Sequence, residues 1–160
     1  NFLRSKMDSA QWFIEAINQR RNTLINVMGT IISSQPEWFA GDMDFLRPLK
    51  LKDIAEKLGI DISTVSRSTR GKYVDTPYGV FELKYFLSEA ITLEGGESVA
   101  TFNVKRCLEK IIWGEDKDNP FNDDTLVSKL ADQNYKLARR TVAKYRDQLG
   151  YPVARLRKKI

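Results

Sequence analysis

The longest uninterrupted periodic segment of this sequence is residues 4–34, which contain no proline and a single glycine, Gly29. Apolar residues recur there at a spacing close to that of a helix, so the segment is predicted to form one helix about 45 Å long. Pro36 follows, as expected where a helix stops. Such a helix cannot bury its own apolar side, so it must pack on later helices of this chain or on another part of a longer protein.

A spacing typical of a helix-turn-helix comes next. Ala55 is followed after four residues by Gly59 and after six more by Val65. This order supplies a small residue where the helices cross, a glycine at the turn and a β-branched anchor beneath the second helix. Asp61 or Ser63 can cap the second helix. An ordinary helical hairpin is the alternative.

The second of these helices is expected to turn hydroxyl and basic side chains outward. Arg67 could pair with a guanine edge, and its neighbours could bond phosphates or bases. The candidate DNA-binding residues of this part are Ser63, Thr64, Ser66, Arg67, Arg70 and Lys72. A turn is predicted at 76–79, and residues 80–87 could form a short helix or part of a small wing.

Residues 92–98, with Gly95 and Gly96 between acids, are predicted to be a linker. Helices are expected afterwards over 99–113, 124–133 and 138–149, with Asp123 and Asp124 at a helix start, where the dipole favours acids. The predicted fold class is therefore all-α, with a long N-terminal helix, a helix-turn-helix domain, a linker and a second small helical domain with its own helix-turn-helix. The expected boundaries are 1–36, 37–91, 92–98 and 99–160.

The last of these helices has two chemically different sides. Its buried stripe is Ala138, Val142, Tyr145 and Leu149. Residues 136–160 carry a net charge of +8 while the whole chain carries +5, so the positive charge is localised, as expected of a surface that meets a polyanion. A solvated charged face is the alternative. The candidate DNA-binding residues are Arg139, Arg140, Thr141, Lys144 and Arg146, and a flexible tail adds Arg155, Arg157, Lys158 and Lys159 as phosphate contacts.

The composition removes much catalytic chemistry. Cys107 is the single cysteine and there is no histidine, so neither a Cys/His zinc site nor an imidazole-activated nucleophile can be built. Cys107 lies in an apolar-periodic run and is expected to be a buried structural thiol, and Asp42 and Asp44 are expected in a solvated loop. We therefore expect no metal, no cofactor and no enzymatic activity. No apolar run is long enough to span a bilayer.

Three segments carry a resemblance to a known family. The run ARRTVAKYR at Ala138–Arg146 resembles the signature box of the sigma-54 class of bacterial RNA polymerase sigma factors. Residues 51–88 resemble the upstream helix-turn-helix of that family, and residues 9–39 resemble the end of its core-binding region. The segments occur in the same order as in the family. The family's glutamine- and leucine-rich N-terminal region and most of its core-binding domain are absent, so we expect a C-terminal DNA-binding fragment.

The resemblance implies a function. Members of this family direct core RNA polymerase to promoters with minus-24 and minus-12 elements, and a separate ATP-hydrolysing activator is needed for opening. By this resemblance the box helix, 138–146, reads the minus-24 GG element, and the upstream helix-turn-helix lies near minus-12. The expected partners are double-stranded promoter DNA, core RNA polymerase and the activator, the last two through the full-length protein. We expect a monomer in the bacterial cytoplasm, associated with the nucleoid and not with a membrane.

Two other functions fit the helix-turn-helix pattern. A conventional repressor would read a palindrome through one module used twice by symmetry, whereas this chain has two unlike modules. A DNA recombinase would need a nucleophile or a carboxylate triad, and the acids here are better explained as caps and solvated surface.

Overall fold

The computed structural model describes residues 2–93 and 95–158, which divide into two compact units. The first unit runs to Gly41 and includes Leu49–Leu87, and the second contains Asp42–Pro48 and the chain from Ser88 onward. The predicted change of unit near residue 92 therefore falls at 87/88, and a short piece of the connector after the long helix belongs to the second unit.

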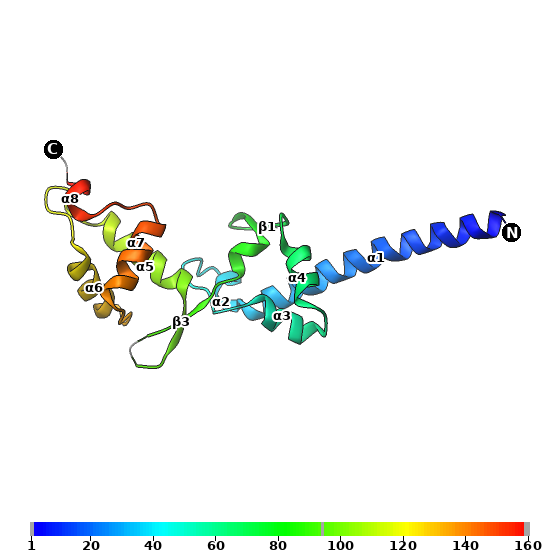
Figure 1. Ribbon diagram of the computed structural model, residues 1–160, viewed down its shortest axis with the longest axis horizontal. Coiled ribbons are helices and arrows are strands. Elements are labelled where there is room, and N and C mark those ends of the chain that lie inside the picture. Colours follow the sequence, from blue (N-terminus) through cyan, green and yellow to red (C-terminus); the bar gives the residue numbers. More distant parts are fainter. Residues whose placement is uncertain (1, 94, 159–160) are drawn as a thin grey trace. The chain divides into compact units, whose positions relative to one another are not determined.

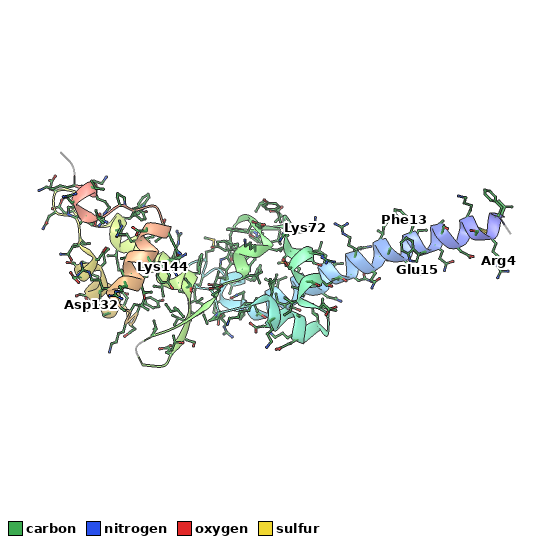
Figure 2. The ribbon with its side chains drawn as sticks, in the orientation of Figure 1. Arg4, Phe13, Glu15, Lys72, Asp132 and Lys144 are labelled. Atoms are coloured by element: carbon green, nitrogen blue, oxygen red, sulfur yellow. The ribbon has the colours of Figure 1, made fainter. Side chains whose placement is uncertain are left out.

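The long predicted helix is confirmed as α1, Phe2–Ser34, shown in blue in Figure 1. Only its C-terminal part is packed, because Val27 and Ile31 are fully buried while residues 2–22 are exposed apart from the half-buried Ala16. Phe13, which projects from α1 in Figure 2, is 61% exposed. The N-terminal half of the helix thus keeps its apolar side chains without cover from the described residues.

The other α-helices of the first unit pack against α1. Besides α1, the elements of this unit are α2 (Pro36–Phe39), α3 (Leu51–Leu58), α4 (Ile62–Thr69), β1 (Tyr73–Thr76), β2 (Gly79–Glu82) and the 3₁₀ helix η1 (Leu83–Phe86). Trp38 is fully buried and meets Phe81 and Phe86 edge-on, with ring centroids 4.9 and 4.8 Å away. This aromatic cluster fixes the hairpin and η1 against α2.

The second unit is built around three helices. Its elements are β3 (Ala90–Thr92), β4 (Ser98–Ala100), α5 (Thr101–Trp113), α6 (Asp123–Asp132), α7 (Arg139–Gln148) and the short α8 (Ala154–Arg157). One apolar cluster joins α5, α6 and α7, with Leu108, Leu126 and Val142 fully buried within it. Cys107 is half-buried at the edge of this cluster, and desolvation raises the pKa of its thiol.

The all-α prediction is wrong in part, because the fold is mostly helical but contains two antiparallel hairpins. In the first, β1 pairs with β2 from Tyr73 opposite Glu82 to Thr76 opposite Gly79. The predicted turn at 76–79 is confirmed, and the wing-or-helix alternative resolves into a wing strand followed by η1. Aromatic and β-branched residues, which favour strands, sit on both sides of this turn.

The second hairpin corrects the predicted linker at 92–98. Thr92 pairs with Ser98, and the Leu93 N–H donates to the carbonyl of Glu97 at 2.8 Å. Gly95 and Gly96 both have positive φ, as a hairpin turn requires. Leu93 is buried in the core of the second unit, which anchors the hairpin. A Gly-Gly pair between acids is equally typical of a linker and of a tight turn, so its composition alone did not distinguish them.

The connector at 42–48 is held by α5. Asn103, which is buried, accepts from the Leu46 N–H at 2.8 Å and donates to the Leu46 carbonyl at 2.9 Å. Asp44 forms ion pairs with Arg106 and Lys110. These cations lower the pKa of the Asp44 carboxyl, mainly through their hydrogen bonds to it. Asp44, predicted to lie in a solvated loop, is therefore only partly exposed and is an ion-pair partner.

Candidate nucleic-acid interface

The upstream helix-turn-helix is formed by α3 and α4. Gly59 ends α3 with φ 63°, and the Ile60 N–H closes the exit by donating to the Ala55 carbonyl at 3.1 Å. Ala55 and Val65 are both buried, as the spacing predicted. Asp61 occupies the cap position of α4, without a side-chain hydrogen bond. The sequence pattern thus identified the turn and its two anchors correctly.

The second helix, α4, presents part of its predicted set to solvent. Ser63, Arg67 and Arg70 are exposed, while Ser66 is half-buried. Thr64, Arg67 and Lys72 line a hollow of about 410 Å³ together with residues of α1. The α1 residues that line this hollow include Gln19, Arg20 and Thr23.

Arg20 was not predicted as a site residue. It comes from a helix far away in the sequence, yet it lines the same hollow as Arg67 and Lys72. The sequence signal that could have found it is its place among polar residues of an amphipathic helix. That signal does not indicate which later element the polar side of the helix faces. The placement of Arg20 beside Arg67 and Lys72 depends on tertiary packing.

The downstream helix-turn-helix is formed by α6 and α7. Asn122 caps α6 by accepting from the Thr125 N–H at 2.8 Å, and Asp123 and Asp124 occupy the first turn, as expected. Asn134, with φ 67°, provides a left-handed exit from α6. Leu137 then enters the core before α7 begins at Arg139.

On α7 the predicted two-sided character is present. Of the predicted buried stripe, Val142 and Tyr145 are buried and Leu149 is half-buried, but Ala138 is exposed because it precedes the first turn of the helix. Arg139, Arg140 and Lys144 are exposed, as predicted. Lys144 is labelled on α7 in Figure 2. Arg139 makes a 3.3 Å ion pair with Asp124, but both side chains are more than 60% exposed, so this pair is worth little and leaves Arg139 available to a ligand. Thr141 is half-buried.

Arg146 departs from the prediction. It was expected on the exposed side of the box helix, but only 2% of its surface is exposed. Its Nε donates to Asp123 at 2.8 Å, and its Nη1 donates to Asp147 and to the Tyr151 carbonyl, both at 2.6 Å. Desolvation opposes the charged form, but the hydrogen bonds and charges of the two carboxylates outweigh it and raise the pKa of Arg146. We therefore remove Arg146 from the set of candidate DNA contacts.

The C-terminal segment is ordered differently from the flexible tail that the sequence suggested. It contains α8, and Arg157 is held by Glu115 through contacts of 2.6 and 2.8 Å. The side chains of this pair are 8% and 6% exposed. Arg155 and Lys158 remain exposed, and Lys159 lies outside the described residues. Two of the four predicted tail contacts therefore stay available in the described chain.

Two helix-turn-helix arrangements with exposed basic side chains on their second helices define this chain as a helix-turn-helix protein suited to a polyanionic ligand. A family model described as the sigma-54 DNA-binding domain matches residues 1–159. The chain belongs to this family, which confirms the resemblance seen in its box and its upstream segments.

Individual relatives agree with this assignment. The RNA polymerase sigma-54 factor of Escherichia coli is 37% identical over 99% of this chain, and that of Bacillus subtilis is likewise 37% identical over 99%. A crystal structure of Aquifex aeolicus sigmaN bound to promoter DNA covers 98% of this chain and 47% of its own, with 31% identity and a TM-score of 0.61. The chain spans 33% and 37% of the lengths of the two curated relatives. Among the described residues, no helix is both long and apolar enough to cross a membrane.

Proposed function

We propose that this chain binds promoter DNA as the DNA-binding part of a sigma-54-type transcription initiation factor. The observation that carries the proposal is α7, which exposes Arg139, Arg140 and Lys144 over a buried face of Val142 and Tyr145. A helix of this kind fits the major groove, where arginine pairs with the O6 and N7 atoms of guanine. The likeness to a sigmaN solved with promoter DNA supports it.

In this proposal α7 reads the GG of a minus-24 element, and the α3–α4 module contacts the minus-12 region through Arg67 and its neighbours. Ser63, Thr64, Ser66, Arg70 and Lys72 complete the upstream set, and Arg155, Lys158 and Lys159 add phosphate contacts. Contacts with core RNA polymerase and an ATP-dependent activator belong, in the same proposal, to the whole bacterial protein. The chain acts as a monomer, so sedimentation with a promoter duplex should give a one-to-one complex, and a two-to-one complex would favour a dimeric repressor.

The test measures how Arg140 distinguishes base pairs. We expect Arg140→Ala to weaken binding to a duplex with the GG element by about 1–3 kcal/mol, because a bidentate contact to guanine is lost. On a duplex in which GG is replaced, the same variant should bind nearly as well as the unchanged chain. Fluorescence anisotropy titrations on both duplexes measure the two affinities.

Lys158→Ala is the matched control, because an exposed lysine on a phosphate contributes equally to every sequence. It should weaken binding to the two duplexes by the same factor. Equal losses for Arg140→Ala on both duplexes would contradict base reading by α7, and an unchanged chain that does not distinguish the duplexes would contradict the proposed function itself.

A further inference from the structure

Two guanidinium groups of the second unit donate hydrogen bonds to the backbone that follows α7. Arg146 donates to the carbonyl of Tyr151, and Arg157 donates to the carbonyl of the next residue, Pro152, each at 2.6 Å. Each arginine also meets an acid from an earlier segment, Asp123 for Arg146 and Glu115 for Arg157. We call Arg146, Asp123, Arg157 and Glu115 the guanidinium clamp.

The Arg146 half of the clamp joins the two helices of the downstream helix-turn-helix. Asp123 is the first residue of α6, and Arg146 lies in the last turn of α7. The side chain of Arg146 is 3% exposed and that of Asp123 is 18% exposed. A buried charge is tolerated only where its hydrogen bonds are made, so the pair restricts how α7 can sit on α6.

The Arg157 half secures the segment on the other side. Its Nη2 also donates to the Phe121 carbonyl at 2.8 Å, while Glu115 accepts from the Phe121 N–H at 2.9 Å. The loop that leads into α6 and the segment that leaves α7 are therefore fastened to each other. The start of α6 and the last turn of α7 are therefore held together by these contacts.

The orientation of α7 matters because hydrogen bonds to a base edge require a defined distance and angle. Arg140 lies six residues before Arg146, about 9 Å along the helix axis. A tilt of α7 about its clamped end moves Arg140 relative to a bound base. Because hydrogen bonds weaken steeply with distance and angle, such a movement can break a bidentate contact. An arginine of the signature box that never touches DNA can thus determine what the exposed arginines read.

We propose that Arg146, held by Asp123, is a positioning residue that sets the orientation of α7 and so governs discrimination between GG-containing and other duplexes. The inference rests on the proposed function of α7. It gives Arg146 a role distinct from that of Arg139, Arg140 and Lys144, although all four lie in one box.

The test compares Asp123→Asn with Asp124→Asn. The two substitutions remove the same charge from neighbouring residues of the same helix turn, but only Asp123 holds Arg146. We expect Asp123→Asn to lower the ratio of affinities for GG and GG-replaced duplexes by about tenfold, a size ordinary for the loss of coupling in a buried pair. Asp124→Asn should leave this ratio unchanged. If Arg146 instead contacted DNA, Asp123→Asn would release it, and the ratio would stay level or rise, which would overturn the proposal.

Arg146→Met provides a second readout. Removing an arginine that contacts a phosphate makes the salt dependence of affinity shallower, by about 1 in the slope of log affinity against log salt concentration. We expect Arg146→Met to keep the slope of the unchanged chain while lowering the discrimination ratio, and a shallower slope would overturn the proposal. A reduced thermal midpoint with an unchanged ratio would also overturn it, since that is a purely structural role.

Folding is checked by circular dichroism, and binding is measured well below the lowest thermal midpoint of the set. If Arg146→Met does not fold, the two asparagine variants decide. The failures of the two proposals are separable, because an unchanged chain that does not discriminate refutes the proposed function. A chain that does discriminate, with Asp123→Asn behaving like Asp124→Asn, refutes the positioning role alone.

Discussion

At the scale of single residues, Asn103 of α5 holds the connector at 42–48 through two buried hydrogen bonds. It satisfies both backbone groups of Leu46, and both residues are buried. We expect Asn103→Ala to destabilise the second unit by about 2–4 kcal/mol, because two buried groups lose their partners. Calorimetric unfolding measures the change. Arg106→Ala, one turn along α5 and exposed, should cost under about 1 kcal/mol, and equal costs for the two variants would contradict the assignment.

Asp44 gives the same connector a pH dependence. Arg106 and Lys110 lower its pKa below the ordinary value of 3.8. A carboxyl with a depressed pKa in the folded state stabilises that state above its unfolded pKa, and this contribution is lost as the pH falls through the folded value. As the pH drops below about 4, we expect the free energy of unfolding of the second unit to decrease. The decrease should be less steep in Asp44→Asn. Denaturation between pH 2 and pH 6 compares them, and parallel curves would contradict the role of Asp44.

Among single residues, the sequence predicted the exposed cations of α7 but not the burial of Arg146. Helical spacing placed Val142 and Tyr145 inside and Arg139, Arg140 and Lys144 outside, because periodicity depends on one helix alone. Arg146 follows Tyr145 directly, at the edge of the buried stripe. Its burial depends on Asp123 lying opposite it, on another helix, and no single-helix pattern contains that information.

At the scale of elements, the turn between α3 and α4 depends on one backbone conformation. Gly59 has φ 63°, and a Cβ added there would meet nothing within 4 Å. We expect Gly59→Ala to cost about 1–2 kcal/mol, entirely from the left-handed backbone. Gly59→Asn should cost less, since asparagine tolerates this conformation. Thermal unfolding of both variants tests this, and an asparagine variant no better than alanine would indicate a steric cause.

The elements also show where local signals are ambiguous. The glycine of the α3–α4 turn could be interpreted correctly because helical periodicity surrounds it on both sides. Gly95 and Gly96 lack such flanks, since the strands beside them have three residues each. Strands this short are specified by their pairing and by the burial of Leu93, both of which arise only in the folded unit. The linker prediction therefore failed where tertiary contacts, rather than local propensity, determine the structure.

At the scale of the whole molecule, the charge distribution predicts strong salt dependence. Seven of the proposed DNA-contacting cations in the described chain are exposed: Arg67, Arg70, Arg139, Arg140, Lys144, Arg155 and Lys158. If all seven neutralised phosphates, the logarithm of the binding constant would fall with the logarithm of salt concentration at a slope of about −6, the steepest value this set allows. Base contacts by α7 make the slope shallower.

The whole-molecule prediction is tested by titrating a promoter duplex at several salt concentrations. We expect a slope between about −3 and −6 for the unchanged chain, and removal of Arg155 and Lys158 together should make it shallower by about 2. Replacing Arg157 by lysine should leave the slope unaltered, because that side chain is buried against Glu115 and cannot release counterions from DNA. A flat response of the unchanged chain would mean that the exposed cations do not meet phosphates. A slope that changed with Arg157 would mean that the tail leaves Glu115 when DNA binds.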